Sequence, residues 1–140
     1  MSSRNVEIVR RVFEAQGRRD WDEVYGHYSP EIEWDGGILW GDWGDRGVAR
    51  GRDALQEAWR RWIEAFEFAE FEAYGYVDAG DDVLVRVRMH ARGRGSGLET
   101  DQVLSLVWTV AGGLVVRVRA YTDLEEAQAA VGLGDASSRV

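Results

Sequence analysis

Residues 53 to 77, DALQEAWRRWIEAFEFAEFEAYGYV, change their hydrophobic period partway along, and this change is the strongest indication of the fold. In the first half, apolar residues recur at helical spacing, and they are Leu55, Ala58, Trp59, Trp62, Ile63 and Phe66. From Phe68 onward, apolar and polar residues alternate. A period near 3.6 predicts an amphipathic helix and a period of two predicts a strand. The stretch therefore predicts a helix from Asp53 to Phe66 that leads into a strand from Phe68 to Val77.

Downstream of this stretch, the period of two continues to residue 121. The strands that it predicts are Phe68–Val77, Val83–Ala91, Glu99–Val110 and Leu114–Tyr121. The segments between them contain turn residues: Asp78 to Asp81, a looser loop from Gly93 to Gly97, and Gly112-Gly113. Short turns between alternating strands predict an antiparallel meander.

Upstream, the sequence predicts helices. Val6, Val9 and Val12 recur at helical spacing, which indicates a first helix from Arg4 to Gln16. Asp20 and Glu23 have the spacing of a capping box, which opens a second helix that Ser29-Pro30 closes. The remaining expected elements are a strand over Glu31–Asp35, a short last helix from Asp123 to Gly132 and a disordered tail over residues 134–140. Together these elements predict an α+β fold, in which helices cover one face of a curved, mostly antiparallel sheet.

Composition limits the classes of function. The chain has 140 residues, which fits one domain, and its formal charge of −8 argues against nucleic acid, because a phosphate backbone needs a basic face. It has no Cys and two His far apart, so we expect neither a metal nor another cofactor. No apolar run approaches the length that spans a membrane, and the first residues carry charges where a secretion signal needs apolar ones. We therefore expect a cytoplasmic protein without a membrane partner.

Several motifs resemble those of a known family. The order of elements, the GRDAL entry to the third helix (51–55), the GRGSG turn (93–97) and the run Val107-Trp108-Thr109 are similar to the nuclear transport factor 2-like superfamily, and within it to the SnoaL-like branch. This resemblance covers residues 4–133 and implies a single domain shaped as an α+β cone, with three N-terminal helices and a short C-terminal helix. It specifies the fold well and the activity poorly, because the scaffold hosts isomerases, cyclases, dehydratases, hydrolases and binding domains.

Pairing the strands through their turns predicts two faces. If Gly112-Gly113 is a two-residue loop, Ser105 lies opposite Ala120; if the 93–97 loop closes symmetrically, His90 lies opposite Asp101. One face then carries Val85, Val87, Met89, Leu104, Leu106, Trp108 and Tyr121. The other carries Arg86, Arg88, His90, Asp101, Val103, Ser105, Val107, Val118 and Ala120. The resemblance implies that the first face, through Val85, Val87, Met89, Leu104, Leu106 and Trp108, forms a homodimer. It also implies that Arg86, Arg88, Ser105, Val107 and Val118 line the pocket.

Asp35 is the first candidate catalytic residue. The resemblance to ketosteroid isomerases implies a general base directly after the first strand, where Asp35 stands. Trp34, Trp40 or Trp59 beside it would reduce the hydration of the carboxylate and raise its pKa towards that of a useful base. The alternative is a turn aspartate that backbone amides satisfy. The isomerases' other catalytic positions correspond to Val12 and Ser105, so their full mechanism does not transfer.

The second candidate pair is His90 with Asp101 across the hairpin, since a carboxylate can position a neutral imidazole as acid or base. An exposed cross-strand contact is the alternative. Ligand contacts are expected from Trp34, Trp40, Trp43 and Trp59, around a glycine-rich loop at the mouth of the pocket. Two main hypotheses follow: an isomerase, cyclase or dehydratase acting on an apolar or aromatic carbonyl compound, or a non-catalytic ligand-binding or accessory domain. A pure interaction module is a third.

Overall fold

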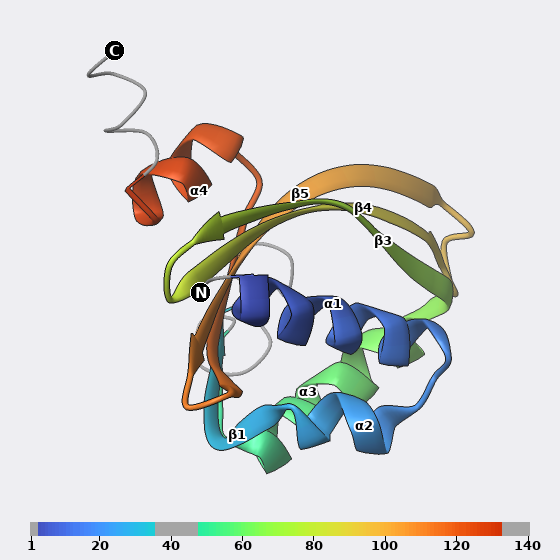
Figure 1. Cartoon of the computed structure of the whole chain (residues 1–140). Coiled ribbons are helices and arrows are strands. Elements are labelled where there is room, and N and C mark those ends of the chain that lie inside the picture. Colours follow the sequence, from blue (N-terminus) through green and yellow to red (C-terminus); the bar gives the residue numbers. More distant parts are fainter. Residues whose placement is uncertain (1–2, 36–47, 133–140) are drawn as a thin grey trace.

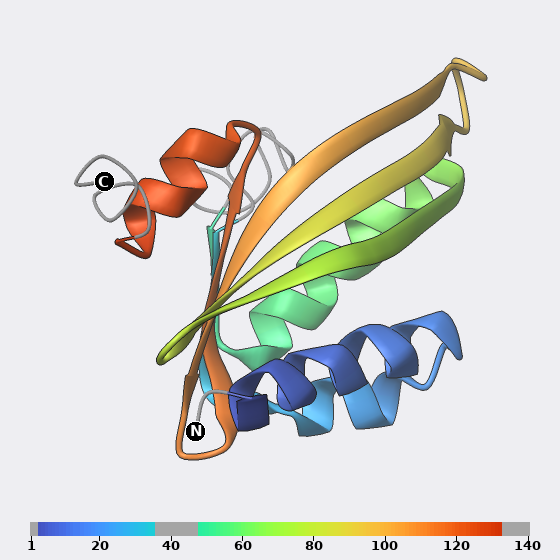
Figure 2. The ribbon, with the colours of Figure 1, turned by 45° about the horizontal axis from the view of Figure 1, so that its top comes forward.

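The computed structural model describes residues 3–35 and 48–132. Its elements are α1 (Ser3–Gly17), α2 (Trp21–Gly26), β1 (Tyr28–Asp35), β2 (Val48–Arg50), α3 (Arg52–Glu64), β3 (Phe66–Ala79), β4 (Asp82–Gly93), β5 (Glu99–Ala111), β6 (Leu114–Tyr121) and α4 (Leu124–Ala130). Six strands form one sheet in the order β2-β1-β6-β5-β4-β3, in which β1 runs parallel to β6 and the other pairs are antiparallel. Figures 1 and 2 show α1, α2 and α3 on one side of the curved sheet and α4 on the other. The predicted fold class is therefore confirmed.

The helix caps explain where α2 and α4 begin. The Asp20 carboxylate accepts a hydrogen bond from the backbone N–H of Glu23 at 3.2 Å, and Asp123 accepts one from Glu125 at 2.9 Å. The predicted end of α2 was wrong, because the helix ends at Gly26 and β1 already begins at Tyr28. Pro30 lies inside β1, where the pairing with β6 is interrupted between Tyr28 and Glu33, so its missing N–H costs no ladder hydrogen bond there.

The strand register agrees with the prediction in one hairpin and differs in the next. His90 pairs with Asp101 as predicted. In the β5–β6 hairpin, Val110 pairs with Val115 but Thr109 pairs with Arg117, so the intervening residue of β6 forms a bulge. Ser105 consequently lies opposite Tyr121 instead of Ala120. The bulge moves Val118 and Ala120 to the face that the prediction gave to Leu106 and Trp108.

The helices cover the sheet face that was predicted to form the dimer. All six residues of that predicted interface are at most 6% exposed, and they are Val85, Val87, Met89, Leu104, Leu106 and Trp108. They form one core with residues of α1 and α3, such as Val9 and Leu55. The predicted dimer surface is therefore wrong, because alternation separates two faces without identifying which of them meets the helices. The more apolar face was buried, as the hydrophobic effect favours.

The predicted pocket-lining residues are divided between the two faces. Arg86, Arg88, Ser105 and Val107 alternate with the core residues of β4 and β5, so they lie on the face away from α1–α3. Val107 packs there against Ala127 of α4, and Arg88 pairs with Asp101 at 3.9 Å. Val118 is fully buried in the main core. Arg86, Arg88, Ser105 and Val107 do not line a pocket beneath the helices, because their face was assigned to the wrong side of the sheet, and Val118 reaches the helical face only through the bulge.

Aromatic rings fill the main core. Trp108 of β5 lies at its centre, with ring centroids 5.3 Å from Phe13, 6.3 Å from Tyr28 and 5.6 Å from Trp34. Most of these contacts are edge-to-face, the arrangement that the ring quadrupole favours. Among the described residues, no helix is long and apolar enough to cross a membrane.

Candidate functional site

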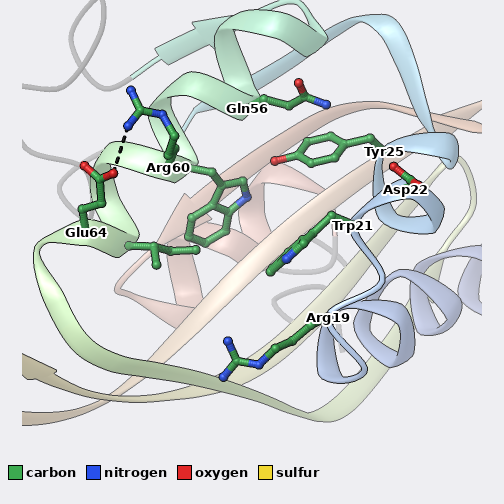
Figure 3. A pocket seen from close by; sticks show the side chains of 9 residues that line it. Arg19, Trp21, Asp22, Tyr25, Gln56, Arg60 and Glu64 are labelled. Carbon is green, nitrogen blue, oxygen red and sulfur yellow. Dashed lines mark hydrogen bonds and ion pairs between the residues drawn. The ribbon is translucent and has the colours of Figure 1, made fainter.

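A cleft of about 430 Å³ lies between α2 and α3, on the helical side of the molecule (Figure 3). Its lining consists of Arg19, Trp21, Asp22, Tyr25, Gln56, Trp59, Arg60, Ile63 and Glu64. A second hollow of about 270 Å³ follows residues 66–71 of β3, and it shares Arg19, Trp21, Trp59 and Ile63 with the first. The two hollows therefore adjoin at these four side chains.

The turn between α1 and α2 builds one wall of the cleft. The backbone N–H of Asp20 donates to the carbonyl of Ala15 at 2.9 Å, and that of Arg19 donates to Gln16 at 3.0 Å. This pair of bonds is the Schellman pattern, which places its C′ residue in the left-handed region. Arg19 occupies that position with a φ of 60°. The tight turn brings Trp21, the first residue of α2, to the rim, and Tyr25 follows one helical turn later.

The opposite wall comes from α3. Gln56, Trp59, Arg60 and Ile63 are spaced three and four residues apart, so they share one face of the helix. Trp59 is 7% exposed and is the most buried of these four, whereas Ile63 is 41% exposed and Trp21, across the cleft, is 36% exposed. Two large apolar side chains thus remain open to solvent on facing helices, above a buried indole.

Several polar groups of the lining are already engaged. Arg60 lies 2.6 Å from Glu57 and also 2.9 Å from Glu64, and Figure 3 shows the second of these pairs. Arg94, in the second hollow, donates to the carbonyl oxygens of Glu64 and Phe66 at 3.1 and 3.0 Å. By contrast, Arg19, Asp22 and Gln56 make no side-chain hydrogen bond or ion pair with any part of the chain that the structure describes. These three groups are available to a ligand.

Tyr25 supplies a further polar group. Burial raises its pKa to about 12, so the phenol stays protonated at neutral pH and keeps its O–H as a donor. Its ring contacts that of Tyr28 edge-on, with centroids 5.6 Å apart. Figure 3 shows the Tyr25 hydroxyl directed towards α3 across the cleft. The cleft therefore combines aromatic walls with one hydroxyl donor.

The predicted base, Asp35, does not line this cleft. It lies at the end of β1, paired in register with Val48 and Arg119. Trp34 before it points into the main core, where it contacts Trp59, so alternation directs the Asp35 side chain to the opposite face of the sheet. The Asp35 carboxylate therefore does not lie beside the indole rings of Trp34 and Trp59. Trp40 and Trp43, the other expected ligand contacts, lie outside the described residues.

His90 and Asp101 lie opposite each other as predicted, but their side chains have other partners. His90 Nε2 lies 3.3 Å from a carboxylate oxygen of Glu99, and Asp101 pairs with Arg88 instead. All four side chains are at least 42% exposed. The two residues therefore face each other without the predicted side-chain contact, because diagonal neighbours on the twisted strands compete for the same charges. Within residues 3–35 and 48–132, no cluster of three or more His, Cys, Asp or Glu is arranged to hold a metal ion.

Of the predicted ligand contacts, Trp59 lines the cleft. The lining residues that sequence reasoning missed are Arg19, Trp21, Asp22 and Tyr25 on one side of the cleft and Gln56, Arg60, Ile63 and Glu64 on the other. One signal pointed to them: Trp21 stands in the polar run RRDWDE, where a large aromatic has no apolar neighbour in sequence. The fold was needed to show that this short helix faces the apolar stripe of α3.

The sequence model of the SnoaL-like domain family matches residues 9–118. Among solved structures, an NTF2-like protein of Burkholderia thailandensis E264 is 28% identical, with a TM-score of 0.75 over 89% of this chain and 95% of that chain. TerC, co-crystallised with polyporic acid, is 17% identical, with a TM-score of 0.75 over 91% and 98%. A Mycobacterium tuberculosis protein in complex with estradiol-17beta-hemisuccinate is 14% identical, with a TM-score of 0.72 over 89% and 97%. No curated protein matches this chain. The predicted family resemblance is confirmed.

Proposed function

This chain belongs to the SnoaL-like domain family, and on that premise we propose that it binds a small, largely aromatic organic molecule in the cleft between α2 and α3. The observation that carries the proposal is the 430 Å³ hollow itself, walled by Trp21, Tyr25 and Trp59. Small-molecule sites have volumes of roughly 300–1,000 Å³ and combine apolar walls with a few polar groups. The cleft has both properties.

The exposed apolar side chains supply a driving force for binding. Trp21 and Ile63 are partly open to water on two facing helices. A flat ring between them would remove apolar surface from water on both sides, at roughly 25 cal/mol per Å². Stacked or edge-on contacts with the indole rings of Trp21 and Trp59 would add about 0.5–1.5 kcal/mol each. A ligand with an aromatic body therefore gains more from this cleft than an aliphatic one of equal size.

The relatives' ligands support the same class. One structural relative was crystallised with polyporic acid and another with estradiol-17beta-hemisuccinate. For this chain we infer a ligand of similar kind, small enough for the cleft and carrying one or two polar groups.

The second proposal is turnover of an apolar or aromatic carbonyl compound, by isomerisation, cyclisation or dehydration with Asp35 as base. It requires a positioned base in addition to a binding site. The carboxylates that line the cleft, Asp22 and Glu64, are exposed, and the Asp35 carboxylate is not part of the cleft lining. Binding without chemistry is therefore the function that the cleft geometry supports best. An Asp35→Asn variant separates the two: loss of product formation with folding retained would establish turnover, and equal turnover by variant and wild type would exclude Asp35 as the base.

A thermal-shift experiment tests binding. We would screen steroids, hydroxyquinones and aromatic acids against wild type, Trp21→Ala and the matched control Tyr74→Ala, whose aromatic side chain is exposed on β3 outside the cleft. A ligand present at about 100 times its Kd stabilises by roughly 2.7 kcal/mol, which is a readily measured shift. We expect Trp21→Ala to lose the shift and Tyr74→Ala to keep it. If no compound shifts wild type, or if Trp21→Ala retains every shift, the cleft is not the binding site.

A further inference from the structure

Arg19 differs from the other two arginines around the cleft. Arg60 is held by Glu57 and Glu64, and Arg94 donates to two carbonyl oxygens at the end of α3. The Arg19 guanidinium makes no hydrogen bond or ion pair within the described ranges of the chain. It also lines both hollows, together with Trp21, Trp59 and Ile63. A free guanidinium thus borders the aromatic surface where the two hollows adjoin.

The backbone at Arg19 is unfavourable for any residue with a side chain. Its φ of 60° is the left-handed conformation, and Arg19 is the one non-glycine residue with positive φ in the described parts of the chain. Glycine is the usual residue at this position of a Schellman turn, because it has no Cβ to clash. Strained positions of this kind concentrate at functional sites, where the side chain is needed. The described parts of the chain supply no partner for the Arg19 side chain, and a ligand in the cleft would supply one.

The direction of the side chain fits such a role. In Figure 3, Arg19 and Trp21 both reach into the cleft from the side of the α1–α2 turn, with the guanidinium below the indole. A ring resting on Trp21 would therefore bring a substituent on its edge towards the guanidinium. The planar guanidinium offers two parallel N–H donors, which match the two oxygens of a carboxylate.

Nearby carboxylates determine where in the cleft the anionic group of a ligand binds. Glu64 is paired with Arg60, and Glu67 lies 3.8 Å from Arg92, so neither competes fully for Arg19. Asp22 and Gln56 line the α2–α3 side of the cleft, where a second anionic group would meet the Asp22 carboxylate. An acidic group is therefore favoured beside Arg19 and a hydroxyl or other donor beside Asp22.

We propose that Arg19 selects ligands with an aromatic body and a carboxylate, by pairing with the carboxylate while Trp21 and Trp59 hold the ring. This inference rests on the proposed binding function and adds the chemical class of the ligand. It also assigns specificity to a residue whose position in the turn costs stability.

Three probes of one shape test the proposal: 2-naphthoate, its methyl ester and naphthalene, titrated by calorimetry into wild type, Arg19→Gln and Arg18→Gln. The Arg18 variant is a matched control, because it removes the same charge one residue away, from a side chain that pairs with Glu23 at 2.7 Å outside the cleft. We expect Arg19→Gln to weaken 2-naphthoate binding about tenfold, the size of one charge-assisted interaction at an exposed site, and to change ester binding less than about twofold. Arg18→Gln should change neither.

The outcomes are distinguishable. If wild type binds acid and ester equally and Arg19→Gln alters neither, the role of Arg19 is overturned while the proposed binding function stands. If Arg18→Gln weakens acid binding as much as Arg19→Gln does, the effect is one of overall charge and the proposal fails. If none of the three probes binds, this inference is overturned, whereas the proposed binding function is decided separately by the thermal-shift screen. Loss of acid binding in Arg19→Gln alone supports the proposal.

Discussion

The aromatic side chains of this protein form two groups with opposite surroundings. In the interior group, Trp34, Trp62 and Trp108 are at most 5% exposed and pack ring against ring beneath the sheet, together with the partly buried Phe13. The cleft group, Trp21 and Tyr25, sits on the short helix α2 and faces the solvent-filled gap to α3. Trp59 belongs to both. A high content of Trp therefore does not by itself indicate a binding site. The interior rings pack against other rings, whereas Trp21 and Tyr25 have one side open towards the cleft.

Trp108→Ala should have the largest effect on folding. Its indole is fully enclosed by Phe13, Tyr28 and Trp34, so truncation leaves a cavity that the surrounding rings cannot close. We expect a loss of about 3–5 kcal/mol in the free energy of unfolding, measured by urea denaturation. Trp21→Ala, in the cleft, should cost less than about 1 kcal/mol. Similar losses in the two variants would show that the distinction between the groups is wrong.

Phe13→Leu should have a smaller effect on the same interior group. The ring of Phe13 meets Trp108 and Tyr76 edge-on, with centroids 5.3 and 6.3 Å apart. Leucine keeps most of the apolar volume and removes these ring contacts, so we expect a loss of about 1–2 kcal/mol by the same denaturation measurement. Ile8→Leu is the control, because it changes the shape of a partly buried side chain of α1 without removing a ring. A loss in Phe13→Leu no greater than in Ile8→Leu would show that ring geometry adds nothing here.

The interior group was largely predictable from the sequence. The change of period near Phe66 marked the α3–β3 junction, and the apolar stripe of α3 placed Leu55 and Trp59 towards the core. What the sequence left undetermined was the side of the sheet that the helices cover, since both faces of β4 and β5 are partly apolar. The bulge near Thr109 was also invisible, because a single extra residue leaves the alternation of apolar and polar residues almost unchanged on either side of it.

The cleft was not predictable in the same way. It depends on the packing of α2 against α3, two elements that are separated in sequence by β1, residues 36–47 and β2. Trp21 and Tyr25 occur in a helix of six residues, too short for a hydrophobic period to identify a face. The left-handed conformation at Arg19 had no sequence signal either, because glycine, the residue that normally announces it, stands two positions earlier at Gly17. Tertiary structure was required to bring these residues together.

Tyr25 distinguishes the cleft group by its response to pH. Burial raises its pKa from 10.0 to about 12 in the folded state, so the folded protein retains a proton that the unfolded chain releases. The stability that this phenol contributes is fully present below about pH 10 and is lost as the pH rises towards about 12. We expect unfolding free energy measured across this range to fall less steeply in Tyr25→Phe than in wild type. Burial also raises the pKa values of Tyr28 and Tyr76, and the charge of Tyr25 adds to the rise at Tyr28, so the difference in slope reports Tyr25 together with its effect on Tyr28. Identical slopes would mean that the Tyr25 hydroxyl is hydrated like that of a free side chain.

Arg19→Gly should have the smallest effect on stability and the opposite sign. The left-handed conformation costs a residue with a Cβ about 1–2 kcal/mol, and glycine avoids this cost but loses roughly 0.5–1 kcal/mol of chain entropy on folding. We therefore expect Arg19→Gly to be more stable than wild type by up to about 1 kcal/mol in urea denaturation. Arg19→Gln, which keeps a Cβ at φ 60°, should show no such gain. A gain in stability combined with weaker binding of aromatic acids would mean that Arg19 serves ligand binding and lowers the stability of the folded protein. A loss of stability in Arg19→Gly would instead mean that the Arg19 side chain supports the turn and that its strain has a structural cause.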